Sequence, residues 1–209
     1  MILPTFNRVQ LVQRAIRSVL SQTTQSIELI IVDDGSTDGS AELIHGLSNG
    51  DTRMRYVHQT NQGLASARNT GVAYASGRYV TFIDSDDEYE SLHLELRKKL
   101  LDTNGDVVML HGGIAVINGS PMVPDYYRPG QMIDVRTCAV GATFFYRREL
   151  HDLIGGFKHR DYGEDTEFFE RVIQAGPVRR VHWPTYRYYR DSDDSIVAQT
   201  ISRLQNPST

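Results

Sequence analysis

Hydrophobic and polar positions follow two alternating periodicities in the first half of the chain. Across residues 8–22 the apolar side chains recur three and four positions apart, which predicts a helix with one buried face. Residues 28–32 (ELIIV) form a β-branched run that stops at Asp-Asp-Gly-Ser, which predicts a buried strand. By the same signals we expect a very short apolar start at Ile2 and Leu3, a helix from Thr37 or Asp38 to Leu47, a strand over 54–58, a helix over 63–75 and a strand over 78–83. This alternation favours a parallel, doubly wound sheet.

The second half of the chain has a weaker pattern. Residues 112–134 are rich in Gly, Pro, Asn and Tyr, so we predict loops and hairpins there. The other signals predict a helix over 92–103, a strand over 106–110, a strand over 142–146 that leads into a short helix ending at Gly155-Gly156, and a helix over 164–175.

Composition limits the classes of protein that fit. With 209 residues, 40% of them hydrophobic, the chain is long enough for one sizeable core and short for two. The net charge of −4 provides no general field for a polyanion, so we expect no nucleic acid partner. The single cysteine, Cys138, excludes an internal disulfide framework and a cysteine-based zinc site.

The sequence carries no signal for membrane insertion. No apolar run approaches the ~18 residues that span a bilayer. The first residues, MILPTFNR, contain no apolar segment of signal-peptide length behind a basic start. We therefore expect a cytoplasmic protein, for which peripheral contact with a membrane stays open.

Acidic residues follow two of the predicted strands. Residues 32–39 (VDDGSTDG) and 79–87 (YVTFIDSDD) each begin with an apolar run and continue into acids. Ligands of doubly wound sheets bind beyond the carboxyl ends of the strands, so both clusters fall where a site is expected. The carboxylates of Asp84, Asp86 and Asp87 raise each other's pKa unless a cation or hydrogen-bond donors compensate. Oxygen ligands from a short turn suit Mg²⁺ or Mn²⁺ bound together with substrate phosphates; the alternative is a solvated turn whose acids cap a helix.

Other nucleotide-binding and calcium-binding loops do not fit the sequence. It contains neither G-x-x-x-x-G-K-[ST] nor G-x-G-x-x-G, so both the P-loop and the dinucleotide fingerprint are excluded. Residues 34–39 match the first positions of an EF-hand loop, but His45 stands where its bidentate Glu is required. In a loop that starts at Asp84, the required Gly falls on Tyr89.

An ordered series of short segments carries a family resemblance. The segments are PTFNR at 4–8, SVLSQT at 18–23, VDDGSTDGS at 32–40, NQGLASARNTG at 61–71, FIDSDD at 82–87, GGF at 155–157 and GEDTEFFER at 163–171. In this order and spacing they resemble the motifs of family 2 glycosyltransferases, which have the GT-A fold. The resemblance implies a doubly wound, mostly parallel sheet with a smaller mixed region on the acceptor side. It also implies one GT-A domain over residues 1–209, in which residues 1–87 bind the nucleotide sugar and residues 88–209 form the acceptor side.

The resemblance implies a donor site at the ends of the first strands. The turn of Pro4, Thr5 and Phe6 lies against the nucleotide base and ribose. Phe6 stands where relatives more usually have Tyr; the Phe ring keeps a stacking face but lacks the hydroxyl. Asp34 accepts a hydrogen bond from the base, and Arg8 reaches a phosphate.

The turn Asp84-Ser85-Asp86 resembles the Asp-x-Asp motif of the family. By this likeness Asp84 lies near the ribose and the metal, Ser85 near the nucleotide sugar, and Asp86 on the metal itself, which is Mn²⁺ or Mg²⁺. Gly63 and Arg68 complete the nucleotide-sugar set. The alternative for Arg68 is a structural role in its loop-to-helix segment.

Glu164 and Asp165 resemble the catalytic dyad of the family, with Asp165 as general base. A sugar hydroxyl is a poor nucleophile, so a carboxylate within hydrogen-bond reach must take its proton as the new bond forms. A metal stabilises the charge that develops on the departing nucleoside diphosphate. One base opposite the leaving group implies direct displacement with inversion at the anomeric carbon. The alternative is that the pair only complements the dipole at the N-terminus of a helix.

The C-terminal part departs from the family pattern. Many relatives carry a His near residues 186–195, where it helps to hold the metal or the diphosphate, but no His follows His182 here. Tyr189, Asp191 or Asp193 would then substitute, or the metal would rest on Asp86 and phosphate alone. The aromatic group of Trp183, Tyr186, Tyr188 and Tyr189 is either a sugar platform or core packing.

These residues predict a metal-dependent, inverting glycosyltransferase of the hexosyltransferase class. Its donor is a nucleoside diphosphate sugar, by family habit a UDP-sugar, and its acceptor is a hydroxyl of a carbohydrate or glycolipid, as in polysaccharide or glycoconjugate biosynthesis. One rival is a nucleotidyltransferase, which would begin with a Gly-rich loop and a Lys that are absent near residues 4–12. The other is a non-catalytic nucleotide- or sugar-binding module, or a fragment of a larger glycosyltransferase.

Overall fold

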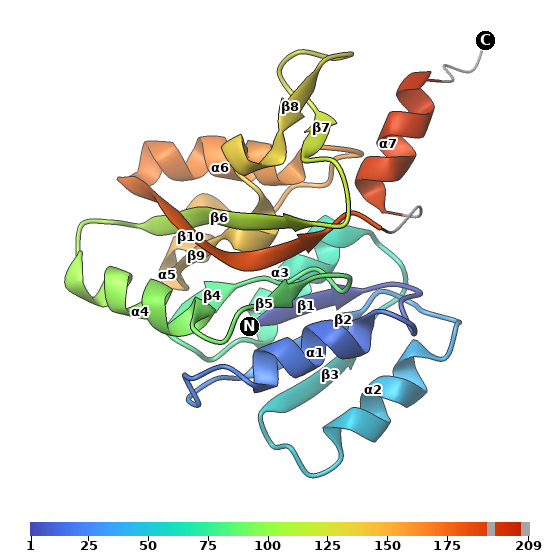
Figure 1. Cartoon of the computed structure of the whole chain (residues 1–209). Helices are drawn as coiled ribbons and strands as arrows, with labels where there is room; N and C mark the ends of the chain where they lie inside the picture. The colour runs from blue at the N-terminus through green and yellow to red at the C-terminus, as the bar shows by residue number, and fades with distance from the viewer. Residues whose placement is uncertain (192–194, 206–209) are drawn as a thin grey trace.

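A three-stranded parallel sheet forms one side of the molecule. The structure is a computed structural model that describes residues 1–191 and 195–205 (Figure 1). Its first sheet has the order β1 (Ile2–Thr5), β2 (Leu29–Asp33) and β3 (Met54–His58). The chain connects these strands through α1 (Val12–Leu20) and α2 (Ser40–Ser48), and α3 (Leu64–Tyr74) follows β3. The alternation predicted for the first half is therefore confirmed.

Helices cover both faces of this sheet, which explains why β2 is apolar along its whole length. Leu29 and Ile31 pack into the cluster that holds the apolar residues of α1, whereas Ile30 and Val32 pack against Ala67 of α3. The small residues of α3 allow a close approach to β1. A Cβ on Gly71 would lie 2.4 Å from a side-chain carbon of Ile2, so this position admits only glycine.

A second, five-stranded mixed sheet continues the first. Its order is β4 (Tyr79–Thr81), β9 (Phe145–Arg147), β6 (Met109–Ile117), β10 (Val178–Tyr189) and β5 (Glu88–Tyr89). A parallel bridge pairs Ile2 with Phe82, and the Ile83 N–H donates to the Ile2 carbonyl at 3.1 Å. Strand β4 therefore lies beside β1, and the two sheets form one continuous surface.

The remaining elements surround the mixed sheet (Figure 1). They are α4 (His93–Thr103), the hairpin of β7 (Met122–Pro124) and β8 (Met132–Asp134), the 3₁₀ turns Val135–Thr137 and Gly141–Thr143, α5 (Glu149–Ile154), α6 (Glu164–Ala175) and α7 (Ile196–Gln205). Helix α7 lies next to β7, although the two are far apart in the sequence. Within the described ranges, no helix is long and apolar enough to cross a membrane.

One prediction for the second half needs correction, and one strand there was not predicted. Strand β6 starts at Met109 and continues to Ile117, inside a segment predicted as loops and hairpins, and only its hairpin β7–β8 matches that expectation. Strand β10, over Val178–Tyr189, has no counterpart among the predicted elements. The register between β6 and β10 shifts between Val181 and Tyr186, and this irregularity interrupts the sequence alternation that marks a strand.

Candidate active site

A cavity of about 600 Å³ lies beyond the carboxyl ends of β1, β2 and β4. This is the edge of the sheet where the acidic clusters predict a ligand site. Apart from Arg68, every residue predicted for the nucleotide sugar or the metal lines it: Pro4, Thr5, Phe6, Arg8, Asp34, Gly63, Asp84, Ser85 and Asp86. We call it the donor cavity.

The C-terminal wall of this cavity was predicted only in part, through the aromatic residues at the end of β10. It consists of Tyr188 and Tyr189 at the end of β10 and of Ser195, Ile196, Val197, Gln199 and Arg203. The signal that could have indicated it is the helical spacing of apolar residues across 196–204 after the last strand.

The turn after β1 presents an aromatic ring to the donor cavity. Phe6 is 44% exposed and lines this cavity. The next residue, Asn7, adopts φ 51° and is fixed by two hydrogen bonds: its N–H donates to Ser36 Oγ at 2.9 Å, and its Oδ1 accepts from the Thr37 N–H at 2.8 Å. The ring is therefore held on a rigid turn, where a planar base can stack on it.

Asp34 organises the other side of this cavity. Its Oδ1 accepts from the Gln62 N–H at 2.9 Å and from Gln59 Nε2 at 2.7 Å, and its Oδ2 accepts from the Gly63 N–H at 2.7 Å. These contacts occupy three of the four lone-pair directions of the carboxylate. One direction on Oδ2 stays available for a donor such as the N–H of a base.

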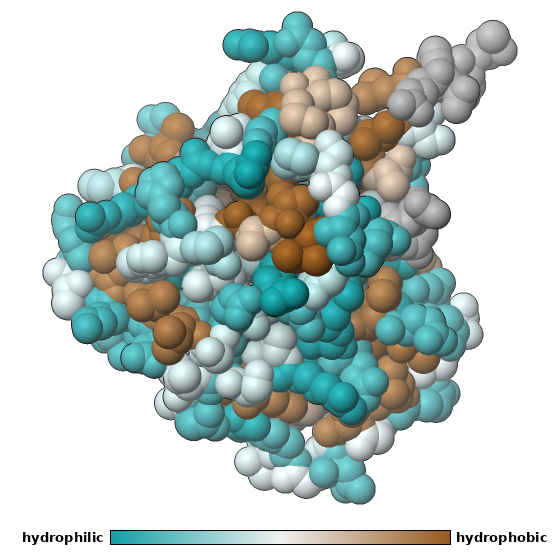
Figure 2. Space-filling view, viewed as in Figure 1, coloured by the Kyte–Doolittle hydropathy of each residue, from teal (hydrophilic) through white to brown (hydrophobic). Residues whose placement is uncertain are grey.

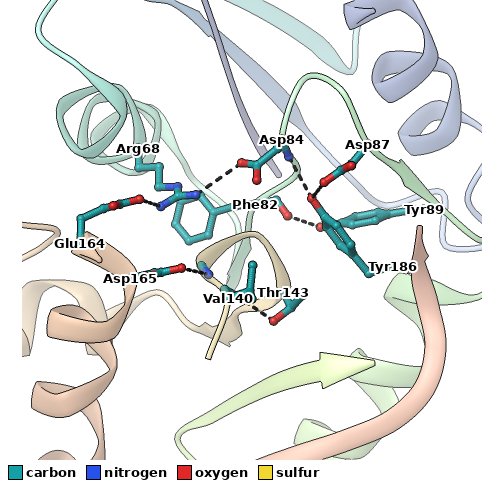
Figure 3. A network of polar contacts seen from close by, with 11 residues as sticks. Arg68, Phe82, Asp84, Asp87, Tyr89, Val140, Thr143, Glu164, Asp165 and Tyr186 are labelled. Atoms are coloured by element: carbon teal, nitrogen blue, oxygen red, sulfur yellow. Dashed lines mark hydrogen bonds and ion pairs between the residues drawn. The ribbon is translucent and has the colours of Figure 1, made fainter. Parts of the chain in front are cut away.

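Arg68 lies behind the cavity and joins the two acidic motifs (Figure 3). Its side chain is 3% exposed; Nη1 donates to Glu164 Oε1 at 2.9 Å and Nη2 donates to Asp84 Oδ1 at 3.3 Å. Burial opposes the charge of Arg68, but the carboxylates of Asp84 and Glu164 outweigh it and raise the arginine pKa. The structure thus places Arg68 in contact with predicted site residues rather than in the wall of the donor cavity.

The three clustered acids after β4 have different surroundings. Asp87 is fully buried; its Oδ2 accepts from the Tyr186 hydroxyl at 2.5 Å and its Oδ1 accepts from the Tyr189 N–H at 2.8 Å. The same hydroxyl accepts from the Asp84 N–H at 3.3 Å, so Tyr186 connects both ends of the acidic turn to β10 (Figure 3). The third acid therefore fixes the turn, and the other two line the donor cavity.

Asp86 is suited to a divalent cation. It is half-buried in the cavity wall, and burial together with the charge of Asp84 raises its pKa to about 6. Arg8 and Arg14 oppose this rise in pKa only in part, and a hard cation with oxygen ligands would stabilise the charged carboxylate further. Among residues 1–191 and 195–205, no three or more His, Cys, Asp or Glu side chains form a metal cluster by themselves. The residues fit an ion that is completed by water and substrate phosphate, as Mg²⁺ usually is.

The candidates for a further metal ligand have other partners or lie elsewhere. The Tyr189 hydroxyl donates to Glu88 Oε2 at 2.6 Å. Asp191 Oδ2 accepts from Asn118 Nδ2 at 3.1 Å. Asp193 lies outside the described residues.

A second cavity of about 320 Å³ contains the predicted catalytic pair. Glu164 and Asp165 are the first residues of α6 and line this cavity, which we call the acceptor cavity. Asp165 Oδ2 accepts from the Gly141 N–H at 3.0 Å and Oδ1 accepts from the Thr166 N–H at 2.7 Å. Burial and the neighbouring charge of Glu164 raise the Asp165 pKa to about 6, against the opposing effects of Arg68 and these N–H groups. The Thr166 hydroxyl also donates to Oδ1 at 3.5 Å, so the free lone pair is on Oδ2, where the carboxylate can accept a proton near neutral pH.

The hairpin β7–β8 forms the outer wall of the acceptor cavity. Tyr162 donates its hydroxyl to the Pro124 carbonyl at 2.8 Å, and the Tyr126 ring lies so close to Gly163 that a Cβ there would approach within 2.2 Å. Apolar residues of the hairpin and its flanks, including Val123, Ile133 and Val135, line the cavity. Figure 2 shows apolar surface gathered at the foot of the hairpin and on α7.

The sequence left two interpretations for the aromatic residues of β10, core packing and a sugar platform, and the four residues do not share one environment. Tyr186 is fully buried, and Trp183 packs against the core. Tyr188 lines both the donor and the acceptor cavity, and Tyr189 lines the donor cavity.

The two cavities meet. Leu64, Asp84, Tyr188, Ile196 and Val197 line both of them. A molecule in the donor cavity and a molecule in the acceptor cavity would therefore approach each other beside Asp84, close to the pair at the start of α6. The sequence indicated residues of both cavities and offered Tyr188 as part of a sugar platform, but it did not predict the shared wall from α7.

Comparisons with known proteins agree with this arrangement. A family described as "Glycosyl transferase family 2" matches residues 1–192. An uncharacterised glycosyltransferase of Haemophilus influenzae is 35% identical over 182 residues, which cover 83% of this chain and 72% of that protein. The glycosyltransferase GlyA of Streptococcus pneumoniae is 41% identical over 109 residues, 52% of this chain, and the match spans only 16% of its own length.

Solved structures confirm the predicted fold. S. aureus TarS 1-349 in complex with UDP-GlcNAc superposes with a TM-score of 0.78, at 20% identity, over 93% of this chain and 59% of that chain. The mannosyltransferase PcManGT of Pyrobaculum calidifontis, in complex with GDP-Man and Mn²⁺, has a TM-score of 0.69 at 22% identity and covers 89% of this chain and 55% of its own. These neighbours are GT-A glycosyltransferases, so the α/β fold class is the expected one.

Proposed function

Because this chain belongs to glycosyl transferase family 2, as its motifs predict, we propose that it transfers a sugar from a nucleoside diphosphate sugar to a hydroxyl of a carbohydrate or glycolipid acceptor. One observation carries the proposal: the Asp165 carboxylate lies in a cavity that meets the donor cavity at Asp84. A hydroxyl group bound beside Asp165 would face the anomeric carbon of a sugar bound beside Asp84. Residues 1–209 act as one domain in this proposal, with residues 1–87 serving the donor and residues 88–209 serving the acceptor.

The donor cavity would bind the nucleotide through its fixed turns. The Phe6 ring, with Pro4 and Thr5 beside it, offers the base a stacking surface, and Asp34 offers it a hydrogen-bond acceptor. Arg8 lines the same cavity and contacts a phosphate in this proposal. The TarS complex contains a UDP-sugar and the PcManGT complex a GDP-sugar, so the fold accepts either base, and we propose UDP.

Asp86, assisted by Asp84, would hold Mn²⁺ or Mg²⁺ against the diphosphate. A bound cation neutralises the charge that develops on the leaving diphosphate. Asp86 is half-buried, and contacts of Asp87, Tyr186 and Arg68 fix the turn that carries Asp86. Because these contacts do not depend on the ligand, the carboxylates need little rearrangement when it binds.

Asp165 would act as the general base. It takes the proton of the acceptor hydroxyl while the hydroxyl oxygen forms its bond to the anomeric carbon and the bond to the diphosphate oxygen breaks. Attack from the side opposite the leaving group inverts the anomeric configuration. Glu164 supports this step through Arg68, because their ion pair keeps the start of α6 next to the acidic turn. Gly141 contributes its N–H, which orients the Asp165 carboxylate toward the cavity.

The proposal is tested by thermal unfolding and by turnover. We expect UDP with Mn²⁺ at ~100 times its Kd to stabilise the protein by about 2.7 kcal/mol, and EDTA to remove most of this effect. GDP and dTDP, each with Mn²⁺ and with EDTA, serve as matched ligands that identify the base. Release of UDP from UDP-sugars, with and without simple glycoside acceptors, separates an enzyme from a binding module. A protein that responds to none of the three nucleotides would overturn the proposed function.

A further inference from the structure

Helix α7 presents one face to the donor cavity. Ile196, Gln199 and Arg203 line the cavity at spacings of three and four positions, which place them on the same side of the helix. They line the same space of about 600 Å³ as Phe6, Arg8 and Asp86. The helix thus brings a third arginine to the site, in addition to Arg8 and the buried Arg68.

The charges of this cavity are unequally compensated. Asp34 is held by N–H groups of the loop 59–63, and Asp84 is paired with Arg68. In the part of the chain that the structure describes, no hydrogen bond or ion pair holds the Arg203 guanidinium. An exposed guanidinium at a cavity that also contains a candidate cation site has the charge and the planar donors that suit phosphate oxygens.

We infer that Arg203 binds the diphosphate of the donor and stabilises it as it leaves. The inference rests on the proposed function and extends it with a positioning residue that belongs to α7, outside the residues 1–192 matched by the family. Two phosphates carry more negative charge than one divalent cation neutralises, so a guanidinium on the open side of the cavity strengthens their binding.

A smaller cavity provides the main alternative. Arg203 also lines a space of about 230 Å³ together with His159, Arg160 and Asp161, and the acidic turn 84–87 does not line this space. An anionic group of the acceptor could occupy this space in place of the donor diphosphate. The two positions differ in a measurable way, because only the first changes the affinity for a nucleoside diphosphate.

The test compares a nucleoside diphosphate with its nucleoside by titration calorimetry in Mn²⁺. The diphosphate is whichever of UDP, GDP and dTDP binds tightest to the unmodified protein. We expect Arg203→Ala to weaken its binding about tenfold and to leave the affinity for the nucleoside unchanged. The diphosphate affinity of Arg203→Lys should lie between those of Arg203→Ala and the unmodified protein, since an ammonium keeps the charge and loses the paired donors.

Two variants serve as controls. Ser202→Ala changes an exposed neighbour on α7, and Arg17→Ala removes one positive charge from the exposed face of α1; neither residue lines a described cavity. Both should bind the diphosphate as tightly as the unmodified protein does.

The remaining outcomes overturn the inference in distinguishable ways. Equal affinity of Arg203→Ala and the unmodified protein refutes the role of Arg203 and leaves the proposed function intact. Equal weakening of diphosphate and nucleoside shows that Arg203 only supports the folding of α7. Unchanged diphosphate binding, with weaker binding of inorganic phosphate in both Arg203→Ala and Arg160→Ala, assigns the residue to the smaller cavity. If the unmodified protein binds no nucleoside diphosphate, the proposed function itself fails.

Discussion

Two arginines are buried among the residues that the structure describes, Arg68 beside the cavities and Arg97 against the mixed sheet, and their surroundings differ. Arg68 is 2% exposed and Arg97 is 0% exposed. Arg68 contacts two carboxylates, which raise its pKa in spite of burial. Arg97 donates to the Gly112 carbonyl and to Thr185 Oγ1, both at 2.8 Å, and burial lowers its pKa to about 10.

The difference follows from what each arginine joins. Arg97 fills the irregular pairing of β6 and β10, where the register shifts and a Cβ on Gly113 would lie 2.3 Å from the Trp183 carbonyl. There it satisfies backbone and hydroxyl oxygens, which need donors once they are buried. Arg68 instead connects residues that the proposed reaction uses.

A buried charge therefore has two uses in one molecule. At Arg97 the polar contacts stabilise the sheet, whereas Arg68 pairs with Asp84 and Glu164, and the pKa values of Asp86 and Asp165 stay raised to about 6. Groups that lack compensation are the ones that a cation or a substrate proton can satisfy. Substitutions in the first region should change stability, and substitutions in the second should change activity.

The largest effect is expected from Asp165→Asn. An amide cannot accept the hydroxyl proton, so the rate of sugar transfer should fall about 10³-fold, or about 4 kcal/mol in barrier height. Donor affinity should stay within a few fold, because Asp165 lines the acceptor cavity and not the donor cavity. Steady-state transfer rates and nucleotide titrations measure the two quantities.

Asp152→Asn is the matched control for this change. Asp152 is an exposed acid on α5 that lines neither cavity, so its loss should leave both the rate and the affinity unchanged. An Asp165→Asn protein that transfers sugar at the normal rate, or that loses donor binding in the same proportion, would exclude Asp165 as the base.

The next largest effect is expected from Arg97→Ala. The substitution leaves a cavity, and the Gly112 carbonyl and Thr185 Oγ1 lose the hydrogen bonds that Arg97 donates to them. The free energy of unfolding should therefore fall by about 3 kcal/mol. Urea unfolding measures it, with the exposed neighbour Lys98→Ala as a control that should stay within about 0.5 kcal/mol. The folded fraction should still bind the donor. A stable Arg97→Ala protein with impaired transfer would reverse the comparison between the two arginines.

The fold could be predicted wherever local side chains decide it. The strand 54–58 coincides with β3 and the helix 164–175 with α6, because their apolar spacing and their flanking residues lie within the segment itself. Strand β10 could not be predicted in this way. Its residues pair with β6 across a register shift that buried Arg97 fills, and no short window of sequence contains that information.

The same division applies to the site. Residues that follow strands, such as Asp34 and Asp86, could be predicted because the carboxyl ends of parallel strands meet at one edge. The contact of Arg68 with Glu164 joins positions 96 apart, and that of Asp87 with Tyr186 joins positions 99 apart. Only the folded chain shows that one clustered acid is structural and that Arg68 links two motifs.

A smaller effect is expected from Tyr186→Phe. This change sharpens the comparison between the Arg68 and Arg97 regions, because the Tyr186 hydroxyl makes a structural contact with Asp87 inside the site. Loss of the hydroxyl leaves buried Asp87 with only the Tyr189 N–H, and the free energy of unfolding should fall by about 2 kcal/mol. Tyr127→Phe, which removes an exposed hydroxyl contact with Glu170, should cost less than about 0.5 kcal/mol. If both variants unfold at the same urea concentration, Asp87 does not depend on Tyr186.

The smallest effect, about tenfold per pH unit, is expected from the titration of Asp165. Its pKa is raised to about 6, so kcat/KM at saturating Mn²⁺ should be constant above about pH 7 and fall as the carboxylate is protonated below about pH 6. The effect on stability has the opposite sign. A folded pKa above the unfolded value makes Asp165 stabilising at low pH, and this contribution is lost as the pH rises through about 6. Acidification should therefore slow transfer without any loss of stability that originates at Asp165, whereas a flat rate between about pH 5 and pH 8 would show that no group with this pKa acts as the base.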